Sequence, residues 1–125
     1  MDNNVYDAFS KWIEGLLSKK LPTEIKAFNF NLYEGKDSFH VQLIGSSSFS
    51  EEDSDWACDE IYSSGENIFI ISNKKSGTKW QDALNFSKEV VQTYLEKGNK
   101  SNLLKASNAV AIGFVDGDLE ILYKK

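Results

Sequence analysis

The chain of 125 residues is 41% hydrophobic and 26% charged, which is typical of one soluble globular domain covering residues 1–125. All 14 basic residues are lysine and the net charge is −5; because arginine is the usual residue for bidentate contacts to phosphate and guanine, this composition argues against nucleic acid as a partner. A lone cysteine, with neither a signal-peptide pattern nor an apolar run of roughly 20 residues, predicts a cytoplasmic protein with no membrane partner.

The first predicted element is a helix over residues 3–20, which ends before Pro22 because proline disfavours a helical conformation in the residue that precedes it. Apolar residues recur in this stretch at steps of three and four, and they form one stripe that would face a core. The stripe consists of Val5, Phe9, Trp12, Ile13, Leu16 and Leu17.

From residue 25 the apolar period changes to two, which predicts a pair of strands, 25–33 and 38–44. The turn 34–37 between them contains glycine, so we expect the two strands to pair as an antiparallel hairpin. The residues expected to point inward are Phe28, Phe30, Leu32, Phe39, Val41 and Leu43, and the alternating polar residues are expected to face outward.

The middle of the chain is less regular. Residues 45–54 are expected to form a polar loop. Residues 55–62 predict a third strand with Trp56 and Cys58 on the same side, and a short helix is the alternative for this stretch. Residues 67–72 predict a fourth strand, because their centre, residues 68–71, is continuously apolar.

A second long helix is predicted after the loop 73–77, because Thr78 and Gln81 have the spacing of a capping box. Gly98 is expected to end this helix in the left-handed conformation, and residues 101–106 predict a short helix. The buried stripe of the long helix is expected to contain Trp80, Leu84, Val91, Tyr94 and Leu95.

The C-terminal stretch predicts a second hairpin, with strands 109–115 and 119–123 around Asp116-Gly117-Asp118, because Asp-Gly between apolar runs is a strong turn signal. Neither face of the first strand is polar, so we expect it in the middle of the sheet, with its small residues against a closely packed helix. Together the elements predict an α+β fold: a single domain with a mainly antiparallel sheet of five or six strands packed by two long helices.

Acidic residues are unevenly distributed, since residues 37–73 carry eight acids and no lysine. Such a run is often only a solvated loop. The functional interpretation is an anionic surface that binds a basic partner and speeds its association. The residues of this candidate surface are Glu51, Glu52, Asp53, Asp55, Asp59, Glu60 and Glu66, with Trp56 as either a core residue or an interface anchor.

No sequence pattern predicts a metal site or a cofactor. Residues 53–55 begin like a calcium loop, but Ala57 and Cys58 occupy the next ligand position and the glycine position. A cysteine hydrolase would need Cys58 beside His40, and acids near a thiol suppress its reactive thiolate form. We therefore expect a protein that is not an enzyme, with a small cysteine hydrolase using Cys58 and His40 as the alternative.

Two stretches resemble small bacterial immunity proteins: residues 55–60 (Asp-Trp-Ala-Cys-Asp-Glu) and residues 109–120 (Ala-Val-Ala-Ile-Gly-Phe-Val-Asp-Gly-Asp-Leu-Glu). In element order the resemblance extends over residues 28–123. Immunity proteins of this kind are the partners of polymorphic toxins, including those of contact-dependent growth inhibition. The resemblance implies a cytoplasmic protein, not an enzyme, that binds and neutralises a cognate toxin domain, expected to be a basic nuclease. A housekeeping protein-interaction domain with no toxin partner is the other alternative.

Overall fold

The first hairpin forms the middle of the sheet. In the computed structural model, which describes residues 3–125, β1 (Ala27–Gly35) and β2 (Ser38–Ser46) pair antiparallel along their whole length. The residues predicted to point inward are buried: Phe28, Phe30 and Leu32 on β1, and Phe39, Val41 and Leu43 on β2. Asn29, on the other face of β1, is buried as well, so the predicted outward exposure of the polar residues is wrong at that position.

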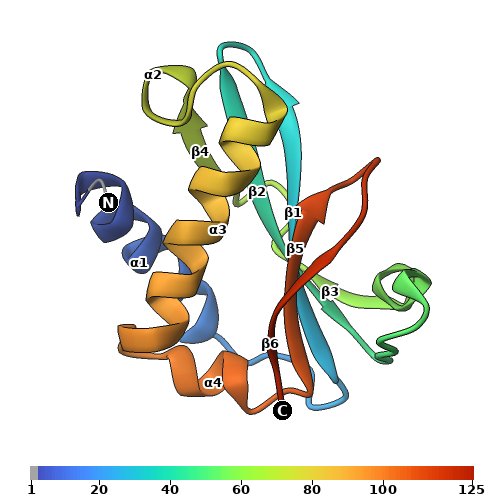
Figure 1. Ribbon diagram of the computed structural model, residues 1–125. Helices are drawn as coiled ribbons and strands as arrows, with labels where there is room; N and C mark the ends of the chain where they lie inside the picture. Colours follow the sequence, from blue (N-terminus) through green and yellow to red (C-terminus); the bar gives the residue numbers. More distant parts are fainter. Residues whose placement is uncertain (1–2) are drawn as a thin grey trace.

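The other strands join this hairpin on both sides. β5 (Ala109–Phe114) pairs parallel with β1, and β6 (Glu120–Lys124) pairs antiparallel with β5. β3 (Glu60–Ser63) and β4 (Phe69–Ser72) pair with different halves of β2 (Figure 1), so the strand order is β3-β2-β1-β5-β6 with β4 also beside β2. The α+β class and the number of strands are confirmed. The sheet is nevertheless mixed, because the long connection from β4 to β5 returns the chain to the start of β1.

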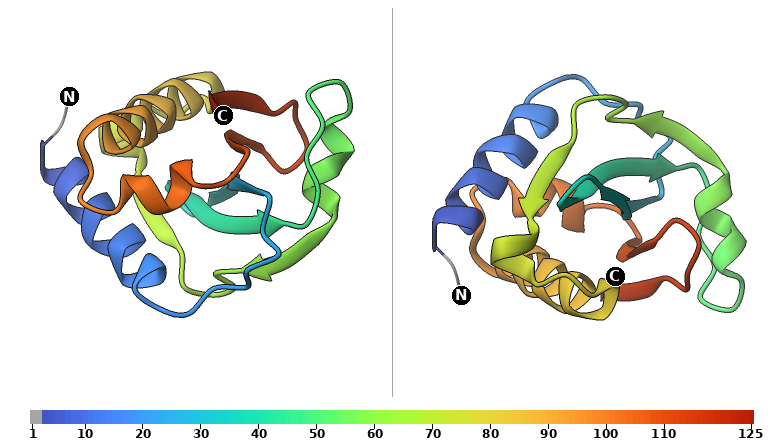
Figure 2. Two further views of the ribbon diagram at one scale, coloured as in Figure 1. Left: turned by 90° about the horizontal axis from the view of Figure 1, so that it is seen from below. Right: turned by 90° about the horizontal axis from the view of Figure 1, so that it is seen from above.

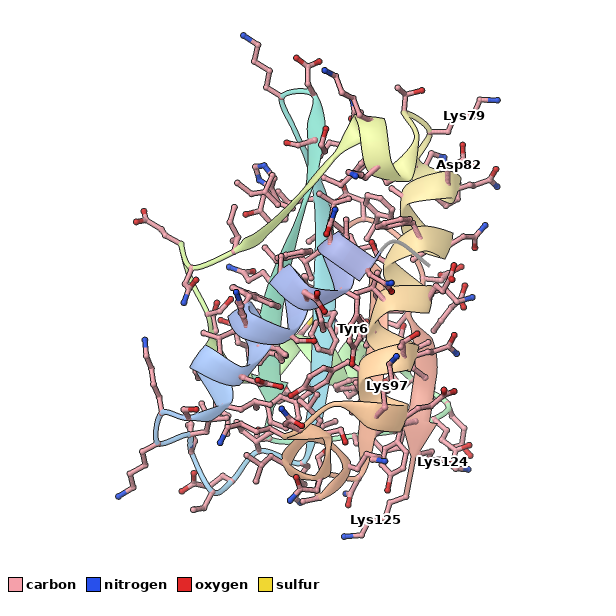
Figure 3. The ribbon with its side chains drawn as sticks, turned by 90° about the vertical axis from the view of Figure 1, so that its left-hand side faces the viewer. Tyr6, Lys79, Asp82, Lys97, Lys124 and Lys125 are labelled. Atoms are coloured by element: carbon pink, nitrogen blue, oxygen red, sulfur yellow. The ribbon has the colours of Figure 1, made fainter. Side chains whose placement is uncertain are left out.

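Two long helices, α1 (Asn3–Leu17) and α3 (Trp80–Lys97), cover the same face of the sheet (Figures 1 and 2). Two shorter helices, α2 (Asn73–Ser76) and α4 (Ser101–Lys105), precede and follow α3 along the chain. The long helices touch near the end of α3, where the Lys97 ammonium lies 5.1 Å from the centroid of the Tyr6 ring (Figure 3). Such a contact between a cation and an aromatic face is attractive.

Phe9 of α1 lies at the centre of the main core. Its ring centroid is 5.8 Å from that of Phe30, 5.5 Å from that of Phe69 and 5.9 Å from that of Tyr94. These rings belong to β1, β4 and α3, so one side chain of α1 contacts three other elements. Tyr94 is fully buried, and its hydroxyl donates a hydrogen bond to the Glu14 carboxylate over 3.1 Å.

The opposite face of the sheet is covered by a much smaller element. A 3-10 helix, η1 (Ser54–Cys58), places the Trp56 ring against the alanines Ala27, Ala109 and Ala111. The sequence predicted that a helix packs closely on these small residues. The helix that does so is the short η1, through Trp56. Because both faces of β1 and β5 are covered, the prediction that β5 is buried on both sides is confirmed.

The middle segment differs from the expected strand over residues 55–62. Residues 54–58 form η1, and the strand begins at Glu60. The turn is stabilised by Asp53, whose carboxylate accepts a hydrogen bond from the Asp55 backbone amide over 3.0 Å. Trp56 consequently points into the sheet while Cys58 is exposed, so the two side chains do not share a face.

Details of the second long helix also differ from expectation. It begins at Trp80 with Lys79 as the N-cap, no side chain caps it, and the predicted capping box is wrong. Gly98 has a φ of −69°, which is not left-handed. Glycine is needed there for another reason, because a Cβ at this position would lie 2.3 Å from an atom of the Tyr94 ring. The buried residues of the helix are Ala83, Ser87, Val90, Val91, Tyr94 and Leu95, whereas Leu84 is half-buried and Trp80 is exposed.

Truncating a side chain at the centre of the sheet should unfold the protein much more readily than truncating one at its surface. Leu32 on β1 is fully buried, so Leu32→Ala should lower the free energy of unfolding by about 2–5 kcal/mol, through lost burial and a residual cavity. Leu103→Ala is the matched control, because Leu103 is 42% exposed on α4. This variant should lower the free energy of unfolding by only about 0.5 kcal/mol. Urea unfolding of the two variants measures both values, and equal losses would contradict the assigned core.

Burial raises the pKa of Tyr94 from 10.0 to about 12, and the hydrogen bond to Glu14 acts in the same direction. The folded state therefore holds this proton more tightly than the unfolded state, and Tyr94 should contribute a loss of stability as the pH rises from 10 towards 12. In Tyr94→Phe the free energy of unfolding should depend less steeply on pH in this window. Urea unfolding at several alkaline pH values measures the slope; an identical slope in both proteins would contradict the assignment.

Candidate functional site

The acidic segment, defined as residues Glu51–Glu60, lies between β2 and β3 and projects from the far side of the sheet (Figure 1, green). Trp56 fastens it there, because its side chain is only 5% exposed and meets the ring of Phe49 edge-on at 5.4 Å. Two hydrogen bonds close the base of the segment: Ser46 Oγ donates to the Trp56 carbonyl over 2.6 Å, and the Ser47 amide donates to the Asp59 carbonyl over 3.0 Å. The acidic segment is therefore anchored to the sheet at its base.

All six carboxylates of the segment face solvent, and three of them also make structural bonds. Glu51 forms an ion pair with Lys124 of β6 at 2.5 Å, Asp53 caps η1, and Asp59 accepts a hydrogen bond from Ser48 Oγ over 2.5 Å. The other three side chains make neither a hydrogen bond nor an ion pair within residues 3–125; they are Glu52, Asp55 and Glu60. These three are the carboxylates that a partner can engage without breaking an existing bond.

The remaining predicted site residues have different positions. Glu66 follows β3 in the turn that includes Gly65, whose carbonyl accepts a hydrogen bond from Gln42 at the middle of β2. It is exposed at the edge of the sheet, beyond the acidic segment. For Trp56, burial supports the role of core residue, and the indole has little surface left for direct contact with a partner.

Cys58 and His40 are not brought together. Cys58 is exposed in η1, next to the C-terminal end of β2, whereas His40 lies near the start of β2. The six residue-to-residue steps from His40 to Ser46 span about 20 Å of extended strand. His40 instead approaches Ser38 Oγ at 3.1 Å and the edge of the Tyr33 ring at 5.1 Å. A hydrolase that uses these two side chains as a pair is therefore incompatible with the fold.

The part of the chain that the structure describes contains no group of three or more histidine, cysteine, aspartate or glutamate side chains arranged to hold a metal ion. A hollow of about 480 Å³ does lie on the acidic segment, and its lining includes Asp53, Asp55, Cys58 and Asp59. Because three carboxylates line this hollow, it favours a cationic side chain over an anionic one.

A second surface was missed by the sequence analysis, which placed Trp80 in the buried stripe of α3. Trp80 is 52% exposed, and two adjoining hollows share Trp80, Phe114 and Gly117 in their linings. We call this pair of hollows the Trp80 groove. Trp80 has the helical phase of the stripe, but it lies on the first turn of α3, beside Phe114, the last residue of β5. The apolar period alone does not reveal that this first turn of the helix is exposed.

Removing the anchor of the acidic segment should loosen that segment. Trp56→Ala should lower the free energy of unfolding by about 3–5 kcal/mol, and the Ser47 and Asp59 amides, which bond within the segment's base, should exchange faster with solvent. Trp56→Phe is the matched control, because it keeps an aromatic ring on the alanine surface. Hydrogen exchange followed by NMR reports each amide, and unchanged protection of Ser47 and Asp59 in Trp56→Ala would rule out Trp56 as the anchor.

Comparison with protein families, with curated proteins and with solved structures finds no match to this chain. None of the helices within residues 3–125 has both the length and the apolar character needed to cross a bilayer.

Proposed function

We propose that this protein is an immunity protein that binds a cognate toxin domain, a basic nuclease, and neutralises it by stoichiometric occlusion through the acidic segment. The observation that carries this proposal is that the six carboxylates of Glu51–Glu60 are all exposed on a segment that is packed firmly onto the sheet. Among the residues that the structure describes, the side chains of three of them, Glu52, Asp55 and Glu60, have no hydrogen bond or ion pair.

The charge arrangement favours a basic partner. Clustered carboxylates repel one another, and a cationic surface would relieve that repulsion as it approaches. Lys124 already does so for Glu51 at one end of the segment. Fixed charges steer an oppositely charged protein and raise its association rate by about 10–10³ at low salt. An enzyme that acts on nucleic acid carries cationic side chains where phosphate binds, so an acidic surface of this kind competes for the same side chains.

The position of the segment suits occlusion. Trp56 fixes its base, so a partner would not have to order a flexible loop at the cost of conformational entropy. The two stretches that resemble immunity proteins also meet in space, because Trp56 packs on Ala109 and Ala111 and belongs to one cluster with Leu119. This proximity supports the view that both stretches contribute to one surface of the molecule.

A direct experiment uses the reading frame immediately upstream of this one. Its C-terminal domain would be purified and mixed with this protein. We expect a one-to-one complex in sedimentation, loss of the domain's nuclease activity in the complex, and rescue of growth when both chains are expressed together. A toxic domain that is neither bound nor inhibited would contradict the proposal.

Neutralising the unbonded acids should slow toxin association without unfolding the protein. We expect Glu52→Gln with Asp55→Asn and Glu60→Gln to lower the association rate by about tenfold at low salt, and to flatten its salt dependence. The effect should shrink when salt reduces the screening length below about 8 Å. Stopped-flow mixing at low and high salt measures the rate.

The matched control removes the same number of charges elsewhere: Asp7→Asn with Glu24→Gln and Glu96→Gln, all at exposed positions outside the acidic segment. If both triple variants change the rate and its salt slope equally, net charge alone accounts for the effect, and the acidic segment is not the docking surface.

A further inference from the structure

The Trp80 side chain is half exposed, and its buried part packs against Phe114. Its ring meets the edge of the Phe114 ring at 6.0 Å with an interplanar angle of 88°, and Phe114 in turn meets Phe39 at 5.9 Å. Phe39 is 2% exposed, so this row of three rings leads from the core to the surface. A tryptophan fixed in this way presents a large apolar face at little conformational cost, which is the character of residues that dominate binding energy at interfaces.

The Trp80 groove has a shaped wall. Its two hollows measure about 400 Å³ and about 620 Å³, and the hairpin between β5 and β6 borders both. The hairpin folds back closely at Gly113, where an added Cβ would lie 2.6 Å from the Asp118 carbonyl oxygen. Val115, which is 56% exposed, lines the smaller hollow with Trp80. The groove thus offers an apolar floor and fixed sides.

The lining of the groove is strongly acidic. It contains no lysine and five acids: Glu34, Asp82, Asp116, Asp118 and Glu120. Glu120 is paired with Lys88 at 2.5 Å, which leaves four exposed acids around the exposed tryptophan. Lys79 lies near Asp82 at the start of α3, but it lines neither hollow (Figure 3). Burying an apolar partner here would leave these carboxylates without compensation, whereas a cationic partner would satisfy them.

We propose that the Trp80 groove binds a basic segment of a partner protein in which lysine or arginine alternates with apolar side chains. The cations pair with the carboxylates of both hollows and stack on the face of Trp80, since tryptophan is the best aromatic acceptor for a cation. The apolar side chains cover Phe114 and Val115. Nucleic acid and anionic lipid surfaces are repelled by the same carboxylates.

This inference goes beyond the proposed function, because the groove and the acidic segment are different surfaces. The groove lies at the end of β5 that carries Phe114, and the segment packs on Ala109 and Ala111, nearer the start of that strand. The binding of a basic segment in the groove does not depend on the partner being a toxin.

The test uses a short fluorescein-labelled peptide of alternating lysine and leucine, with a glutamate–leucine peptide as its charge control. Fluorescence anisotropy measures the dissociation constant. We expect the lysine peptide to bind the native protein, and Trp80→Ala to raise its dissociation constant by about tenfold or more. We expect the same for Glu34→Gln with Asp116→Asn and Asp118→Asn. Leu103→Ala and the triple Asp7→Asn, Glu24→Gln, Glu96→Gln are the apolar and charge controls, and both should bind as the native protein does.

Several outcomes would overturn the proposal. These are an unchanged affinity in Trp80→Ala, equal binding of the glutamate–leucine peptide, and loss of binding in Glu52→Gln, Asp55→Asn, Glu60→Gln instead of in the groove variants. A dimer in sedimentation that Trp80→Ala dissociates would also overturn it, because the occupant would then be a second copy of this chain. If circular dichroism shows that Trp80→Ala does not fold, the variant Glu34→Gln, Asp116→Asn, Asp118→Asn provides the test. An unchanged affinity of that variant for the lysine peptide would then contradict the proposal.

Discussion

The parallel pairing of β1 with β5 is the constraint on which the rest of the structure depends. It places two strands in the middle of the sheet, and their residues are buried on both faces, with Phe30 and Ile112 on the helix side and Ala111 on the other. Each face must then be covered by a different part of the chain. Two long helices cover the face with large side chains, and the short η1 covers the face with alanines. The alanines allow the close approach that brings Trp56, and with it the acidic segment, against the sheet.

Local sequence patterns predicted the elements better than their connections. The two-residue period identified the first hairpin, and the helical period identified α1 and α3, because each pattern reports one buried face of one element. The parallel partner of β1 was not predictable in this way, since it follows from a long return of the chain. The reason for a glycine was not predictable from its position either. Gly98 is required because the Tyr94 ring leaves no room for a side chain, and its backbone is not left-handed.

The candidate surfaces were predictable in part for the same reason. The exposure of the acids follows from their charge, so Glu52 and Asp55 lie where the sequence placed them, at the surface. The structural partners of the other acids were not predictable from the sequence. The ion pair of Glu51 with Lys124, for example, joins residues 73 positions apart. The Trp80 groove was invisible for a similar reason: residues 33, 80 and 114–117 meet only in the folded chain, and the apolar period of α3 assigns Trp80 to the core.

The sheet carries two acidic surfaces, one anchored by Trp56 and one around Trp80. We propose that a basic toxin domain binds the first. The most direct test is the hydrogen-exchange footprint of the complex between this protein and the toxin domain that we propose as its partner. We expect the backbone amides of residues 47–60 to gain protection on binding, and those on the outer face of α1 to gain none. Protection confined to α1 and α3, with none in residues 47–60, would contradict it.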